Sequence, residues 1–128
     1  MVRRSIVITR LLISNGHALE RRQTHALPEG WDAGLPEFTA ENGAVASRAA
    51  SGAVLNALAA RLPELVGGSA DLTPSNNTLL KQADVFSADN HAGRNVHFGV
   101  REHGMGAIMN GMALHGGVRP YGGTFLVF

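Results

Sequence analysis

Residues 95–117, NVHFGVREHGMGAIMNGMALHGG, constrain the fold more than any other part of the chain. A short β-branched and aromatic run is followed at once by apolar and small residues, which predicts a strand passing directly into a helix over residues 102–115. That helix carries too few charges for a solvated face, so we expect it to be buried. Arg101, Glu102 and His103 stand together at the strand–helix junction, and this charged triplet is the first candidate for a functional site.

The rest of the pattern predicts an α/β fold with a parallel sheet. A helical pattern begins near Ser47, which we expect to be the N-cap, and Pro63 ends it. Buried-strand patterns occupy ELVGGSADL, NVHFGV and VRPYGGTFLVF, and their alternation with helices favours parallel strands joined by crossover helices. Such sheets bind ligands at the carboxyl ends of their strands, where GGSADLTPSN and GVREHG fall.

Three zones divide the 128 residues, a length suited to one domain. Residues 1–26 hold a β-branched run and then polar sequence. Residues 27–43 are rich in proline, glycine and acids and predict an extended linker. Residues 44–128 carry the α/β pattern, and their last strand runs to the end of the chain. We therefore expect an incomplete domain, truncated at its C-terminal end, and a chain that is a fragment of a longer protein.

Composition argues against several classes of protein. A formal net charge of +1 gives no electrostatic case for nucleic acid. No apolar run reaches the ~20 residues that a membrane-spanning helix needs. The absence of cysteine removes disulfide and thiolate chemistry and suits a cytoplasmic protein. The histidines His97, His103 and His115 lack an accompanying carboxylate pattern, so we assign no metal ligands.

Each polar or aromatic segment leaves two interpretations open. Glu102 either faces the positive end of the helix dipole or presents a carboxylate to a ligand from a rigid junction. GGSADLTPSN either forms a capped turn or offers N–H groups and hydroxyls to an anion. Phe125 and Phe128 either pack in the core or line a flat pocket, if the strand bends at its glycines or ends near Phe128.

Two stripes run along the predicted helix of residues 102–115. One stripe is apolar and is expected to be core; its members are Met105, Ile108, Met109 and Met112. The other is small and would let a second backbone approach closely, within the chain or from a partner subunit; its members are Gly104, Ala107 and Gly111.

In GGSADLTPSN, VREHGMGAIMNGMALHGG and PYGGTF the chain resembles transketolase, and the similarity extends from about Leu27 to Phe128. Transketolase transfers two-carbon ketol units between sugar phosphates in the pentose phosphate pathway, with thiamin diphosphate as its cofactor. The resemblance implies that this chain belongs to the pyrimidine-binding domain, an α/β fold whose cofactor lies between two subunits.

The resemblance also implies cofactor-binding roles. Glu102 would be the catalytic residue, hydrogen-bonded to the N1′ nitrogen of the aminopyrimidine ring so that the ring's amino group takes the proton from the thiazolium carbon. Phe125 and Phe128 would flank the pyrimidine, and Asp71 would lie beside the cofactor. The protein's contribution would be orientation and electrostatics, while the cofactor supplies the electron sink.

For the substrate, the resemblance implies that Arg48 and Ser75 bind the sugar phosphate, Arg48 through charge-assisted hydrogen bonds. It implies a Mg²⁺ or Ca²⁺ ion held by a diphosphate-binding domain absent from this chain, and hence a homodimer or a partner domain. We therefore expect the isolated chain to be inactive. Two alternatives stay open: a non-catalytic remnant serving as a dimerisation or interaction module, and another thiamin-diphosphate ketol enzyme, such as a dihydroxyacetone or deoxyxylulose phosphate synthase.

Overall fold

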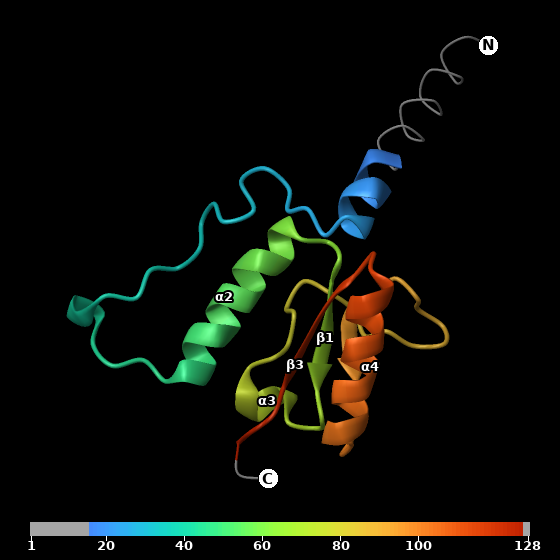
Figure 1. Ribbon diagram of the computed structural model, residues 1–128. Helices are drawn as coiled ribbons and strands as arrows, with labels where there is room; N and C mark the ends of the chain where they lie inside the picture. Colours follow the sequence, from blue (N-terminus) through green and yellow to red (C-terminus); the bar gives the residue numbers. More distant parts are fainter. Residues whose placement is uncertain (1–15, 127–128) are drawn as a thin grey trace.

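A computed structural model describes residues 16–126 as a small α/β structure (Figure 1). Residues 16–23 form a helix. The elements that follow are η1 (Ala40–Asn42), α2 (Ser47–Arg61), β1 (Leu65–Ser69), α3 (Thr73–Asn76), β2 (Asn95–His97), α4 (Glu102–His115) and β3 (Arg119–Gly123). The strands form one sheet in the order β2-β1-β3, and both pairings are parallel. The predicted fold class is confirmed.

The central strand β1 explains the paired glycines of GGSADL. β1 has a parallel neighbour on each side, and Gly67 is in register with both Asn95 and Tyr121. An added Cβ at Gly67 would overlap the carbonyl oxygen of Tyr121, and one at Gly68 would overlap that of Val96. The two glycines are therefore required by the close approach of the flanking strands.

Two small hydrophobic clusters cover opposite faces of the sheet. The first lies under α2 and contains Ala59, Leu62, Leu65 and Leu80. The second lies under α4 and contains Ala70, Phe98 and Met105. In β3, Tyr121 packs against the first cluster, whereas Gly122 faces the methionines of α4, as the alternation of side chains along a strand requires.

Burial of α4 is confined to one side of the helix. Met105 is buried and Met109 packs against it, as predicted. The prediction was wrong for Ile108, which is 52% exposed, and Leu114 is 88% exposed. The reason is that α4 packs mainly on β3, which leaves Ile108 and Leu114 largely uncovered among the described residues.

Two boundaries differ from the predicted pattern and one agrees with it. α2 begins at Ser47, but its N-cap is Ala46 and no side chain caps it, so the predicted N-cap was wrong by one residue. The helix ends at Arg61, just before Pro63, as expected. β3 ends at Gly123 because its partner β1 ends at Ser69, directly opposite. The strand predicted through the C-terminal phenylalanines is therefore shorter, and its last two residues lie outside the described range.

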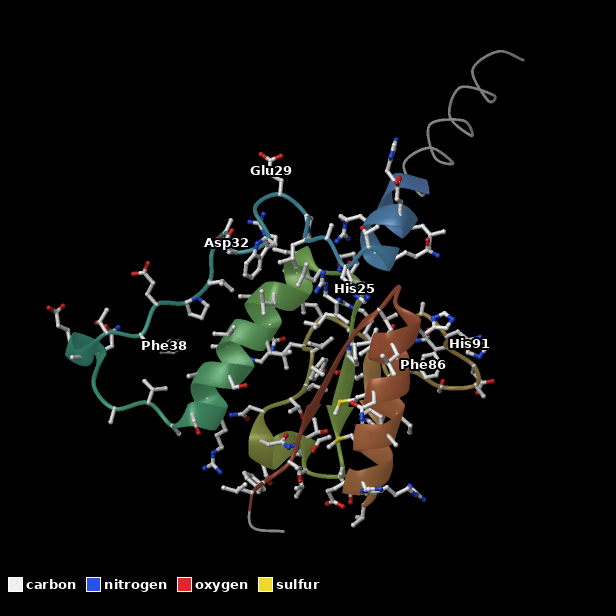
Figure 2. The ribbon with its side chains drawn as sticks, in the orientation of Figure 1. His25, Glu29, Asp32, Phe38, Phe86 and His91 are labelled. Atoms are coloured by element: carbon white, nitrogen blue, oxygen red, sulfur yellow. The ribbon has the colours of Figure 1, made fainter. Side chains whose placement is uncertain are left out.

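Outside the sheet, residues 27–43 run past α2 in turns and in η1 (Figure 1). Figure 2 shows Glu29, Asp32 and Phe38 along this segment, and Phe86 and His91 together on the loop before β2, where their ring centroids are 5.9 Å apart. None of the helices in residues 16–126 is long and apolar enough to cross a membrane.

The helix of residues 16–23 is attached to the sheet through Glu64, whose side chain is 1% exposed. Arg21 donates two hydrogen bonds to the Glu64 carboxylate, from Nη1 at 2.6 Å and from Nη2 at 3.0 Å. Arg22 and Arg119 lie at 3.6 and 3.8 Å from the same carboxylate. Burial raises the pKa of Glu64, but hydrogen bonds from Arg21 and the backbone, together with the charges of Arg21 and Arg22, outweigh it and leave the pKa below its ordinary value.

Candidate functional site

Two adjoining cavities open at the carboxyl edge of the sheet, which is the edge predicted to carry the site. The larger, of about 490 Å³, is lined by Ser69, Asp71, Thr73, Pro74, Leu79, His97, Gly99 and Arg101. The smaller, of about 350 Å³, is lined by Ala70, Asp71, Leu72, Val100 and Glu102. Asp71 belongs to both cavities, so the structure places it beside Glu102 at one site.

Glu102 is the first residue of α4, and a sharp turn directs it into the smaller cavity. In that turn Gly99 has a φ of 66°, and the amide of Arg101 donates to the Gly99 carbonyl at 2.8 Å. The Arg101 guanidinium closes the turn by donating to the carbonyl of Phe98 at 3.0 Å. The turn leaves Glu102 half-buried among the apolar side chains of its cavity, where a carboxylate can bond a ligand nitrogen.

Asp71 occupies a strained backbone position in the turn that follows β1. Its φ is 63°, a left-handed conformation that is uncommon outside glycine. The next amide, that of Leu72, donates to the hydroxyl of Ser69 at 3.2 Å, which holds the turn against the end of β1. The Asp71 side chain is exposed, so it is free to meet a ligand in either cavity.

Arg48 and Ser75 are 27 residues apart in the sequence and come together in space. Arg48 lies in the first turn of α2, and its Nη1 reaches the carbonyl oxygen of Ser75 in α3 at 3.5 Å. Both residues are exposed. The pair predicted to bind a phosphate therefore forms one polar corner, next to the loop that carries Asp71.

The aromatic residues of the predicted pocket lie after the sheet. Phe125 is half-buried and follows the end of β3 by two residues, at the same edge as Glu102. Phe128 lies outside the described residues. β3 ends at Gly123, earlier than the strand end near Phe128 that we considered, and the role of Phe125 and Phe128 in ring binding stays a prediction.

No metal centre is formed by the part of the chain that the structure describes. Residues 16–126 contain no group of three or more histidine, cysteine, aspartate or glutamate side chains able to hold an ion. The donor set at the cavities is one aspartate, one glutamate and the exposed His97, spread over two cavities.

The sequence interpretation missed how two polar residues of GGSADLTPSN are used. Ser69 and Asn76 are buried and hydrogen-bonded to each other at 2.8 Å, so neither is available to an anion. The segment is thus a buried hydrogen-bonded turn that presents Asp71 and Ser75 outward. The sequence gives no signal for the burial of Ser69 and Asn76, because the composition of this stretch is that of an exposed loop.

Comparison with known proteins agrees with this geometry. The sequence model of the family described as "Transketolase, pyrimidine binding domain" matches residues 43–128. The transketolase of Mycobacterium tuberculosis is 55% identical over 119 residues, covering 86% of this chain and 17% of the relative. That of Geobacillus stearothermophilus is 54% identical over 110 residues, covering 86% and 16%. This chain therefore belongs to the transketolase family, in its pyrimidine-binding domain.

Solved structures give the same assignment. A transketolase mutant from Pichia stipitis matches with a TM-score of 0.85 and 44% identity, over 94% of this chain and 19% of that chain. The transketolase from Leishmania mexicana matches with a TM-score of 0.83 and 44% identity, over 92% and 18%. The chain thus spans less than a fifth of the length of these relatives.

Proposed function

We propose that this chain forms the pyrimidine-binding part of a transketolase that transfers a two-carbon ketol unit between sugar phosphates with thiamin diphosphate. One observation carries the proposal. Glu102 enters a cavity with apolar walls at the carboxyl edge of the sheet, and Asp71 lines the same cavity. A carboxylate fixed by a strand–helix junction in such surroundings suits recognition of one ring nitrogen.

The residues at the smaller cavity fit a thiamin pyrimidine. Its lining offers one half-buried carboxylate and the apolar side chains of Ala70, Leu72 and Val100, which suit a flat heterocycle with a protonatable edge. We propose that Asp71, Glu102, Phe125 and Phe128 bind this ring. When bound, thiamin diphosphate supplies an acidic thiazolium carbon and the electron sink for ketol transfer.

Within this assignment Glu102 holds a proton between its carboxyl oxygen and the ring nitrogen. The apolar side chains of Leu72 and Val100 line the cavity beside that hydrogen bond. Orientation comes from the turn before α4, where the Arg101 guanidinium is bonded to the Phe98 carbonyl. The chain's contribution is thus a directed proton position on a rigid support.

Arg48 and Ser75 are proposed to bind the phosphate of the sugar. An arginine guanidinium and a serine hydroxyl at one exposed corner provide charge-assisted and neutral hydrogen bonds to phosphate oxygens. We propose that the diphosphate and its Mg²⁺ or Ca²⁺ ion are held by a second domain, in a homodimer partner or a partner chain.

The test is Glu102→Gln in the native protein that contains this chain, captured from its source cell after its intact mass is measured against 13.5 kDa. Glutamine keeps the size of the side chain but cannot hold the shared proton. We expect kcat to fall by roughly 10²–10⁴-fold, while the Kd for thiamin diphosphate rises far less. Glu41→Gln, an exposed change in η1, is the matched control.

Each alternative has its own outcome. Equal turnover in Glu102→Gln and wild type would exclude the assigned role of Glu102. A wild-type protein that binds its partner but turns over no ketose phosphate would favour the interaction module. Turnover of a ketose donor without use of a sugar-phosphate acceptor would favour a dihydroxyacetone synthase.

A further inference from the structure

The hydroxyl of Ser69 joins three segments of the site at one oxygen atom. Ser69 ends β1 and is 1% exposed. Its Oγ donates to the carbonyl of Gly123 at 2.8 Å and accepts hydrogen bonds from Asn76 Nδ2 at 2.8 Å and from the Leu72 amide at 3.2 Å. A serine hydroxyl has one donor and two acceptor positions, so Ser69 has none left for a ligand.

The hydrogen bonds continue beyond Ser69 in one direction. Thr78 donates to the Asn76 side-chain oxygen at 2.8 Å, Asn76 donates to Ser69, and Ser69 donates to the end of β3. Asn76 and Thr78 are each 8% exposed. Bonds aligned in this way polarise one another in a buried site of low dielectric constant. We call these three side chains, Ser69, Asn76 and Thr78, the Ser69 network.

Gly123 has no side chain, which allows the Ser69 network to pack directly against the end of β3. A Cβ added at Gly123 would overlap the methyl group of Thr78 and lie 3.2 Å from Asn76 Nδ2. The backbone at the end of β3 is therefore in direct contact with the network, and a displacement of one is transmitted to the other.

Each segment that meets at Ser69 carries a residue of the proposed site. The bond to the Leu72 amide fixes the turn in which Asp71 has its left-handed conformation. The bond to Asn76 fixes the end of α3, which carries Ser75. The bond to the carbonyl of Gly123 fixes the end of β3, two residues before Phe125.

We propose that Ser69 is a positioning residue, which sets the distance between the phosphate-binding corner at Ser75 and the ring-binding segment at Phe125. The inference rests on the proposed function and adds to it. The phosphate-binding corner and the ring-binding segment must both be aligned with the reacting centre, and a small misalignment lowers the rate steeply. Without the Ser69 hydroxyl, the Asn76 amide and the Gly123 carbonyl lose their shared partner, and the side-chain hydrogen bonds that link the end of α3 to the end of β3 are lost.

The experiment compares two donors in the native protein, a ketose phosphate and the same ketose without phosphate. We expect Ser69→Ala to lower kcat/KM for the phosphorylated donor about tenfold more than for the other donor, the equivalent of one lost hydrogen bond. Thr78→Val removes the first hydrogen-bond donor of the network at nearly constant shape. It should therefore lower the ratio of kcat/KM for the phosphorylated donor to kcat/KM for the unphosphorylated donor. Thr78→Ser restores the hydroxyl and should restore the ratio, and the exposed Ser51→Ala leaves it unchanged.

If Ser69 had a role in stability alone, its loss would lower kcat/KM by the same factor for both donors. That result in Ser69→Ala and Thr78→Val would overturn the inference. If the wild type turns over neither donor, the proposed function fails. Hydrogen exchange then tests whether the Ser69 network couples the turn at Leu72 to the end of β3. Ser69→Ala should accelerate exchange of the Leu72 amide and of amides in residues 124–126, and Thr78→Ser should not. Unchanged exchange in residues 124–126 would show that the two segments are not coupled.

Discussion

Replacing Glu64 with glutamine should release the helix of residues 16–23 from the sheet. The carboxylate side chain is 1% exposed and accepts two hydrogen bonds from Arg21, at 2.6 and 3.0 Å. Hydrogen bonds to a charged group contribute about 1.5–3 kcal/mol each. Arg21 is 22% exposed and regains water when released, so we expect the attachment to weaken by about 2–3 kcal/mol in total.

The assay is limited digestion with trypsin, which cuts after Arg21 and Arg22 only when the helix opens. A weakening of 2–3 kcal/mol corresponds to roughly 30–150-fold faster cleavage at these bonds. Glu20→Gln makes the same change of charge at an exposed position of the same helix and is the control. Cleavage of Glu64→Gln at the wild-type rate would refute the view that the buried carboxylate holds the helix.

Acid should have the same effect in the wild type. The pKa of Glu64 lies below its ordinary value of 4.5, so the unfolded or detached form takes up the proton first. The stabilisation is therefore complete above about pH 4.5 and is lost as pH falls through the lowered pKa. Hydrogen exchange of residues 16–26 should report an opening constant that rises with acid in the wild type and stays flat in Glu64→Gln.

Three further predictions concern the sheet and the turn before α4. Burial raises the pKa of Tyr121 to about 12, and its hydroxyl donates to the Thr78 carbonyl at 2.8 Å. Ultraviolet titration of this single tyrosine should show late ionisation, with stability lost as pH rises from about 10 to about 12, and ionisation near pH 10 would contradict the packing. Gly67→Ala should lower the free energy of unfolding by about 3 kcal/mol or more in a denaturant melt, since its Cβ overlaps Tyr121, and an unchanged midpoint would exclude that close approach. Arg101→Met should lower kcat about tenfold with partial rescue by guanidinium, because the Phe98 carbonyl loses its donor, and full activity would show that the turn holds without it.

Local signals in the sequence were sufficient for α2, α4 and the positions of the strands, but they predicted neither the helix of residues 16–23 nor α3. The helix predicted over residues 102–115 is the observed α4, and the strand expected in ELVGGSADL is β1. These elements could be read because helix and strand periodicity, glycines and prolines act within a few residues of the chain. The parallel sheet followed from their order, because strands separated by a helix pair in parallel.

Partners distant in the sequence could not be read in this way. The contact between Arg48 and Ser75 and the attachment of Arg21 to Glu64 join residues 27 and 43 positions apart, and no local pattern encodes either. Burial also misled the prediction at Ile108, because an apolar side chain is buried only where another part of the chain covers it, and Ile108 is 52% exposed.

The sequence by itself determined the class of fold, the strand–helix junction that carries Glu102, and the segments that form the carboxyl edge. Only the tertiary structure decided which polar groups of those segments face a ligand and which are used inside the protein. Ser69 and Asp71 come from the same short stretch, yet one is saturated by buried hydrogen bonds and the other is exposed at both cavities. The difference arises because β3 and α3 supply hydrogen-bonding partners at the end of β1 but not in the turn that follows it.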